Sequence, residues 1–346
     1  MNTIRRERAP RARPGQEREI PTMKRMIAGI LALILMLAFS ASAASDGDRS
    51  ITTGLPTDHE ARIMVCQMDN EPGARPQKGI GSADIVYEVE IYDGGYTRYT
   101  AVFNDTIPEQ IEAVRSARIV HADICYEYQG AFIHYGGQKY PGSDVYYTFK
   151  ILENFGTRYD GINGDRDFYR DRSRKSPNNV ICNLKNLYDR TDWSTMVCKS
   201  PLRFRKKFAV PKQGEAVTKF RVPYQKKAYC PGYVWDAELK RYRRYYNDKP
   251  YVDGATDEQV LVDNIIVQHV EYDWFEGKSD RPKVELTGEN KCDYFIGGKH
   301  FTGTWKRSKI SKNTVYFDEN GKKVKLNPGT TYIQLLRTER DLEILE

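Results

Sequence analysis

The chain has 346 residues, and its 54 basic and 47 acidic side chains give a formal net charge of +7 at pH 7. Residues 1–44 hold eight Lys and Arg against three Asp and Glu, so the rest of the chain carries 46 basic and 44 acidic side chains, a net charge of +2. This balance argues against nucleic-acid binding, and the length beyond residue 44 suffices for one large domain or two ordinary ones.

The N-terminal region, residues 1–44, is predicted to be an extension followed by a signal peptide. Met23 opens a short basic stretch that precedes the apolar run 27–39, and Ala41-Ser42-Ala43 forms a small-residue cleavage site. The apolar run is short for a membrane span, which needs about 20 residues. We expect synthesis to start at Met23, cleavage near Ala43-Ala44 and a secreted, extracytoplasmic protein that meets the membrane only if the signal stays uncleaved.

Residues 45–60 are polar and are predicted to be a flexible leader. The region 61–205 then mixes strand and helix patterns. Strands are expected at 61–70 and 131–137, a hairpin over 83–104, and helices at 108–128 and from Pro177 to Tyr188. Residues 140–175 are rich in Gly, Asp, Arg and Tyr, which predicts long loops with a helical turn at 147–154.

A basic junction at 199–216 leads into the region 206–346, where apolar and polar residues alternate almost throughout. Gly297-Gly298 and the turn at 319–321 are typical hairpin connections. In the strand KRYRRYY, the side chains of Arg241, Arg243 and Tyr245 are expected opposite those of Tyr242, Arg244 and Tyr246. The predicted fold is therefore α+β, with an N-terminal α+β domain followed by a β-rich C-terminal domain, a meander or small barrel.

All six cysteines follow the predicted signal peptide: Cys66, Cys125, Cys182, Cys198, Cys230 and Cys292. An even count outside the cytosol is compatible with three disulfides, and Cys182 and Cys198, the closest pair in sequence, are the first candidates for a bridge. The alternative is that several are buried free thiols.

The sequence lacks the motifs of the common catalytic classes: G-x-S-x-G, H-E-x-x-H, the phosphate-binding loop and G-x-G-x-x-G. No metal site and no cofactor are predicted. The histidines are scattered, and His134 is the one of interest, because the glycines after it leave room for a ligand.

Four arginines form the positive signal: Arg75, Arg98, Arg115 and Arg118. Arg115 and Arg118 are three residues apart and would share one side of a helix. If the four converge, they would bind a carboxylate or phosphate group through paired donors. The alternative is a structural network in which they pair with Asp84, Glu88 and Glu90.

Four segments in this order, ARPQKGIGSADIVYE, GGYTRYTAVF, EAVRSARI and FIHYGG, resemble the N-terminal domain of the YerB-like family of bacterial envelope proteins. The downstream run from YRRYYNDKPYVDG to GTTYIQLL resembles that family's second, β-rich domain. The resemblance implies an exported protein, usually a lipoprotein, although this chain lacks a lipobox cysteine. Its signature residues here would be Arg75, Pro76, Gly79, Asp84, Glu88, Thr97, Arg98, Arg115, Ser116, Arg118, His134 and Gly136.

These observations favour a non-catalytic envelope protein that binds an anionic group of a cell-wall polymer, a peptide or a protein partner. Arg75, Arg98, Arg115, Arg118 and His134 would bind it, supported by Asp84, Glu88, Thr97, Ser116 and Gly136. One alternative is an envelope-polymer hydrolase with Asp84 or Glu88 as acid or base and His134 assisting. Nearby arginines would lower a carboxyl pKa, which opposes that role. A structural or scaffolding role is the third reading.

Overall fold

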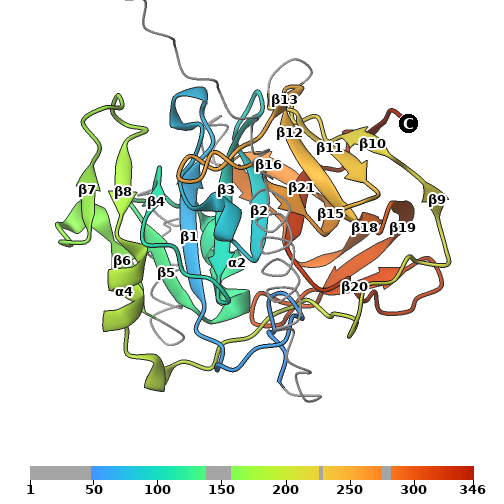
Figure 1. Cartoon of the computed structure of the whole chain (residues 1–346), viewed down its shortest axis with the longest axis horizontal. Coiled ribbons are helices and arrows are strands. Elements are labelled where there is room, and N and C mark those ends of the chain that lie inside the picture. The colour runs from blue at the N-terminus through green and yellow to red at the C-terminus, as the bar shows by residue number, and fades with distance from the viewer. Residues whose placement is uncertain (1–47, 138–156, 226–228, 275–281) are drawn as a thin grey trace, which may run out of the picture. The chain divides into compact units, whose positions relative to one another are not determined.

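The computed structural model of the chain describes residues 48–137, 157–225, 229–274 and 282–346 (Figure 1). The predicted signal peptide and the predicted helical turn at 147–154 lie outside the described residues. Within the described part of the chain, neither helix has the length and apolar character needed to cross a membrane.

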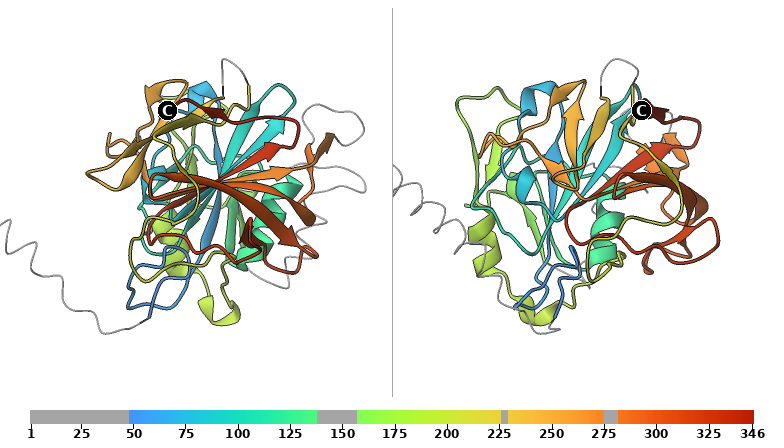
Figure 2. Two further views of the ribbon diagram at one scale, coloured as in Figure 1. Left: turned by 90° about the vertical axis from the view of Figure 1, so that its right-hand side faces the viewer. Right: turned by 45° about the vertical axis from the view of Figure 1, so that its right-hand side comes forward.

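One large sheet organises the described residues. Its strands follow the order β20-β19-β18-β15-β21-β2-β3-β1-β5-β6, with β9 paired to β19. Their bounds are β1 (Met64–Asp69), β2 (Ile85–Tyr92), β3 (Tyr96–Phe103), β5 (Ala131–His134), β6 (Arg158–Asp160), β9 (Glu215–Ala216), β15 (Asn264–Val270), β18 (Gly288–Ile296), β19 (Lys299–Arg307), β20 (Val315–Asp318) and β21 (Thr331–Arg337). Figure 2 shows these strands fanning around one another, as expected from the twist of a long sheet.

Seven strands of this sheet run in the same direction: β1, β2, β5, β6, β15, β19 and β21. β5 pairs parallel to β1 and to β6, while β21 pairs parallel to β2 and to β15. β3 lies antiparallel between β1 and β2. The carboxyl ends of β1, β5 and β6 therefore meet at one edge, the position where open sheets with parallel strands commonly bind ligands.

Three smaller sheets surround the large one. A six-stranded sheet contains β10 (Lys219–Arg221), β11 (Pro231–Asp236), β12 (Arg241–Tyr246), β13 (Lys249–Pro250), β14 (Leu261–Val262) and β22 (Glu343–Ile344). The other two contain β4 (Ile111–Glu112), β7 (Phe168–Arg170) and β8 (Val180–Cys182), and β16 (Tyr272–Trp274) with β17 (Pro282–Val284). The two helices of the described residues are α2 (Ile119–Tyr128) and α4 (Leu184–Arg190).

Each face of the large sheet has its own hydrophobic core. On one face, Val86 and Tyr99 pack with residues of β10 to β12, β8 and α4. On the other, Val65 and Tyr87 pack with α2 and with Trp305. We call these the tyrosine face and the helix face. Successive residues of a strand alternate between them.

The predicted α+β class is wrong, because the described residues are mostly β and contain only two short α-helices. The N-terminal region contributes five strands to the large sheet and three to a small one. The region from residue 206 is β-rich as expected, but its strands divide between the large and the six-stranded sheet instead of closing a barrel. The predicted boundary at 205/206 stays a prediction.

The helix predicted at 108–128 exists only from Ile119 onward. Before it, the chain is extended and donates Val114 N to Val180 O, Arg115 N to Gln67 O and Ala117 N to Gly136 O. The backbone groups of these residues bond to other segments of the chain. This tertiary hydrogen bonding outweighs the helix that the spacing of the apolar residues predicted.

All six cysteines are free thiols, so the suggested Cys182–Cys198 disulfide is wrong. Cys182 belongs to the core of the tyrosine face, whereas Cys198 packs against the core of the helix face. A sheet separates the two sulfur atoms, and a disulfide needs Cα atoms within about 7 Å. Burial raises the pKa of the Cys66 and Cys182 thiols, which keeps them protonated and unreactive.

Candidate functional site at the carboxyl edge of the parallel strands

The residues predicted to form one site lie on both faces of the large sheet. Thr97 and Arg98 are neighbours in β3 and therefore point in opposite directions. The Thr97 hydroxyl donates to Glu88 on the tyrosine face, whereas Arg98 donates to the carbonyl of Ser116 on the helix face. The predicted set thus separates into two clusters, and Asp84 belongs to neither.

Asp69 is the centre of the cluster on the helix face. It is the last residue of β1, is fully buried, and lies opposite Arg98 in the β1–β3 register. Its Oδ2 accepts from Arg115 Nε at 2.7 Å, and its Oδ1 lies 3.8 Å from Arg98 Nε. Arg115 also reaches Glu71 at 3.4 Å. Two of the four predicted arginines therefore converge, and they do so on an acid outside the predicted set.

Arg98 is 4% exposed, and its guanidinium is only partly satisfied. Burial lowers the pKa of Arg98, Asp69 opposes that shift, and Arg115 adds to it. Nε has no hydrogen-bond acceptor within the described part of the chain, although Asp69 lies near. A buried charged donor without an acceptor is costly, so a partner for this atom would stabilise the cluster.

The start of α2 closes the cluster. Arg118 is its N-cap residue, and its backbone N–H donates to His121 Nδ1 at 2.8 Å. The proton of neutral His121 then resides on Nε2, which is buried and finds no acceptor among the residues described. Burial holds the pKa of His121 well below its usual range, and Arg98 and Arg118 lower it further.

His134 ends β5 on the same face. Its Nδ1 donates to Gly136 O at 2.8 Å, which assigns the proton to Nδ1, and Asp160 Oδ1 lies 3.7 Å away. Burial lowers the pKa of His134, while Asp160 and the Gly136 carbonyl oppose that shift. Gly136 has a φ of 74° and donates its N–H to Asp160, so this glycine turn is required by the backbone.

Ser116 and Gln67 complete the edge. The Ser116 hydroxyl donates to Tyr135 O at 2.9 Å. Gln67 lies two residues before Asp69 on the same face and accepts from Thr100, while its Nε2 has no acceptor in the described ranges. We call the set Gln67, Asp69, Arg98, Arg115, Ser116, Arg118, His121, His134 and Asp160 the carboxyl-edge cluster.

The second cluster lies on the tyrosine face around Glu88, which is fully buried. One carboxylate oxygen accepts from Asn70, Thr97 and Tyr246, and the other accepts from Arg244 Nη2 at 3.0 Å. Burial raises the pKa of Glu88, and Arg244 is the largest opposing influence.

Arg75 belongs to this second cluster. Its guanidinium donates to Asn70 and lies 4.0 Å from the ring centroid of Tyr246. Arg244 is itself enclosed by aromatic rings, with centroids at 4.0 Å for Tyr251 and 4.8 Å for Tyr332. As the alternation of KRYRRYY predicted, Arg244 shares a face with Tyr242 and Tyr246, and the structure shows that this face is the buried one.

Asp84 lies apart from both clusters. It accepts from Thr52 Oγ1 at 2.7 Å and from Asp105 N at 3.1 Å. Burial, followed by the charge of Asp105, raises the pKa of Asp84 to about 7. Asp84 thus ties residues of the predicted leader to the fold.

Several central residues escaped the sequence prediction. Asp69, Glu71 and Asp160 were passed over, and His121 was treated as an isolated histidine. A usable signal existed for Asp69 and His134, since each ends a predicted strand and strand ends in parallel sheets carry ligand-binding residues. Arg244 lies far from Glu88 in sequence, so no local sequence pattern could have predicted that the two side chains pair. Among the described residues, no three His, Cys, Asp or Glu side chains form a metal-binding group.

Comparison with known proteins finds a family match for both the N-terminal and the C-terminal region of the chain. Residues 52–196 match the family described as "Protein of unknown function (DUF3048) N-terminal domain", and residues 220–333 match its C-terminal domain. "Putative lipoprotein YerB" of Bacillus subtilis is 25% identical over 292 residues, covering 82% of this chain and 85% of that protein. The crystal structure of YerB from Bacillus subtilis superposes with a TM-score of 0.71 at 24% identity, covering 84% of this chain and 97% of that one, which shows a shared fold. With both domain models matched over most of its length, the chain belongs to the YerB-like DUF3048 family.

Proposed function

We propose that this protein works outside the cytoplasm at the cell envelope, where its carboxyl-edge cluster binds an anionic group of a cell-wall polymer or of an envelope protein. The location is supported by the signal-peptide pattern at 23–44 and by the lipoprotein name of the relative from Bacillus subtilis.

The observation that carries the proposal is a set of unused donors. Arg98 Nε, His121 Nε2 and Gln67 Nε2 are buried at one edge of the sheet and lack acceptors within the described part of the chain. A carboxylate or phosphate group offers several acceptor oxygens and would satisfy such donors. The half-buried Arg115 and Arg118 lie near these donors and add positive charge, and the amino end of α2 adds a favourable dipole.

The geometry gives less support to a hydrolase that combines Asp84 or Glu88 with His134. Glu88 lies on the opposite face of the sheet from His134, and its two oxygens accept four hydrogen bonds. Asp84 accepts a hydrogen bond from Thr52, a residue of the predicted leader. These carboxyl groups therefore cannot share a substrate with His134, and a binding role fits better.

The test is binding of the mature chain to purified cell-wall fragments. The variant Arg115→Gln/Arg118→Gln should bind at least about tenfold more weakly, because two charge-assisted contacts are lost. Arg172→Gln is the matched control, since Arg172 is exposed and lies outside the cluster. Circular dichroism and melting temperature establish that each variant is folded. Equal binding by the double variant and the parent would contradict the proposal.

A further inference from the structure

A second surface, outside the carboxyl-edge cluster, is basic and contains a groove. Two hollows of about 220 and 440 Å³ adjoin, because both are lined by Ser200, Leu202 and Asn313. Their walls also contain four cations and no Asp or Glu: Arg49, Lys199, Arg203 and Lys323. We call this surface the basic face.

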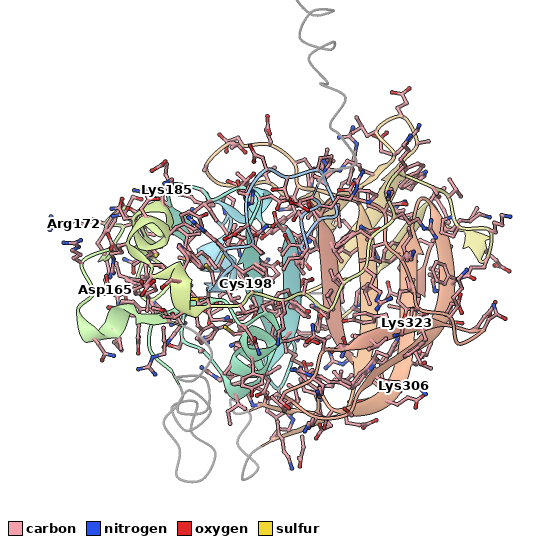
Figure 3. The ribbon with its side chains drawn as sticks, turned by 90° about the horizontal axis from the view of Figure 1, so that it is seen from below. Asp165, Arg172, Lys185, Cys198, Lys306 and Lys323 are labelled. Carbon is pink, nitrogen blue, oxygen red and sulfur yellow. The ribbon has the colours of Figure 1, made fainter. Side chains whose placement is uncertain are left out.

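The cations of the basic face are available to a partner. Lys199, Arg203 and Lys323 are exposed and make no salt bridge with any described residue, while Arg49 donates only to the Gly54 carbonyl. Four more exposed lysines neighbour them along the same segments: Lys207, Lys312, Lys322 and Lys325. Cys198 and Lys323 are labelled on this side of the molecule in Figure 3. Like charges without counterions repel, so this arrangement gains from an extended anionic partner.

Large apolar side chains are exposed on the same segments. Val197, which precedes Cys198 and Lys199, is 72% exposed. Phe208 and Val210, which follow Lys207 in sequence, are 40% and 52% exposed. Leu55 is 44% exposed beside Gly54, which packs against Phe204 in the groove wall. The segments that carry the cations of the basic face thus also carry exposed apolar side chains.

We propose that the basic face docks on a membrane surface that contains anionic phospholipids. Lysine and arginine attract the headgroup phosphates, while Val197, Phe208 and Leu55 can enter the boundary between headgroups and acyl chains. A soluble polyanion would use the cations and leave the apolar groups in water, so the combination favours a bilayer.

Vesicle co-sedimentation tests the proposal with the mature chain. Vesicles of phosphatidylcholine mixed with phosphatidylglycerol should bind at least about tenfold more protein than pure phosphatidylcholine vesicles, and added salt should weaken the binding. Reversing three charges in Lys199→Glu/Arg203→Glu/Lys323→Glu should abolish the difference. The neutralised variant Lys199→Gln/Lys323→Gln should lower it, and it keeps the test valid if the reversed variant does not fold.

The matched control is Arg172→Glu/Lys249→Glu/Lys283→Glu, which reverses three exposed charges elsewhere and should bind like the parent. Equal binding by the parent and the charge-reversed variant, or binding to soluble polyphosphate but not to vesicles, would overturn the proposal.

Discussion

The ion pair between Glu88 and Arg244 is the contact on which the tyrosine face depends most. Both side chains are fully buried, and Arg244 also donates to Tyr99 OH at 3.0 Å. Removing one partner of a buried pair leaves a charge without compensation, which costs about 3–5 kcal/mol. A buried cation enclosed by tyrosine rings also gains cation–π attraction.

Arg244→Met is therefore expected to lower the free energy of unfolding by about 3–5 kcal/mol, measured by urea denaturation. Arg243→Met is a matched control one residue away, because Arg243 pairs with Asp236 near the surface and should cost below about 1 kcal/mol. The double variant Glu88→Gln/Arg244→Met should lose less than the sum of its single variants. Strict additivity would show that the two side chains are not coupled.

Asp84 predicts an unusual pH dependence. Its pKa is raised from 3.8 to about 7 in the folded protein, so between these values the folded state holds a proton that the unfolded state has released. The free energy of unfolding should then fall as pH rises through this window, by a total of about 4 kcal/mol from this group. The pKa of Asp123 is also raised to about 7 by burial and acts in the same direction.

Asp84→Asn should make this pH dependence of the free energy of unfolding less steep, as measured by denaturation at several pH values between about 4 and 7. An unchanged slope would mean that Asp84 is ionised in the folded protein. Asp48→Asn is a suitable control, because Asp48 is exposed.

The orientation of single side chains and the position of turns could be predicted from sequence where they depend only on neighbouring residues of the chain. Strand alternation predicted that Arg244 shares a face with Tyr242 and Tyr246, and the glycine pair predicted the turn after His134. The partners did not: Arg98 and Arg115 meet Asp69 instead of Asp84, Glu88 or Glu90. Those pairings depend on which face each strand presents, and this is fixed only when the strand order is known.

At the scale of elements, the hairpin of β2 and β3 and the pairing of β18 with β19 followed from alternation and turn glycines. Residues 108–118 did not follow from their apolar period. They cross the end of the sheet in extended form, bonded to β1 on one side and to residues after β5 on the other. The site depends on this crossing segment, because it carries Arg115 and Ser116 to the carboxyl edge.

β19 and β20 approach closely at Gly303, where an added Cβ would lie 2.0 Å from the Phe317 carbonyl oxygen. Gly303→Ala should therefore lower the free energy of unfolding by about 2 kcal/mol or more, since backbone must move. Gly232→Ala in β11 is the control: its Cβ would meet only ordinary contacts beyond 3.5 Å and should cost little. Equal melting temperatures for the two variants would contradict the close approach.

At the scale of the whole described unit, residues from both family domains form one sheet. β21 from the C-terminal region pairs parallel to β2 of the N-terminal region. The two strands are also linked by side chains, because the Glu90 carboxylate in β2 accepts hydrogen bonds of 2.8 and 2.9 Å from Arg337 in β21. The sequence indicated two regions but not their shared sheet, because parallel pairing between distant strands leaves no local pattern.

Residues 45–205 expressed alone should not fold cooperatively, because β2 would lose its β21 neighbour and Glu88 would lose Arg244. Co-expression with residues 206–346 should restore folding and yield a stable pair on gel filtration. A cooperative melting transition of the isolated N-terminal region would contradict this expectation.

Binding of an anion by the carboxyl-edge cluster can be observed directly in crystals of the mature chain soaked in selenate. We expect an anomalous peak with selenate oxygens within hydrogen-bond distance of Arg98 Nε and His121 Nε2. A cluster with no anomalous peak, in which both atoms donate to acceptors of the protein itself, would contradict this expectation and assign the arginine motif to the fold.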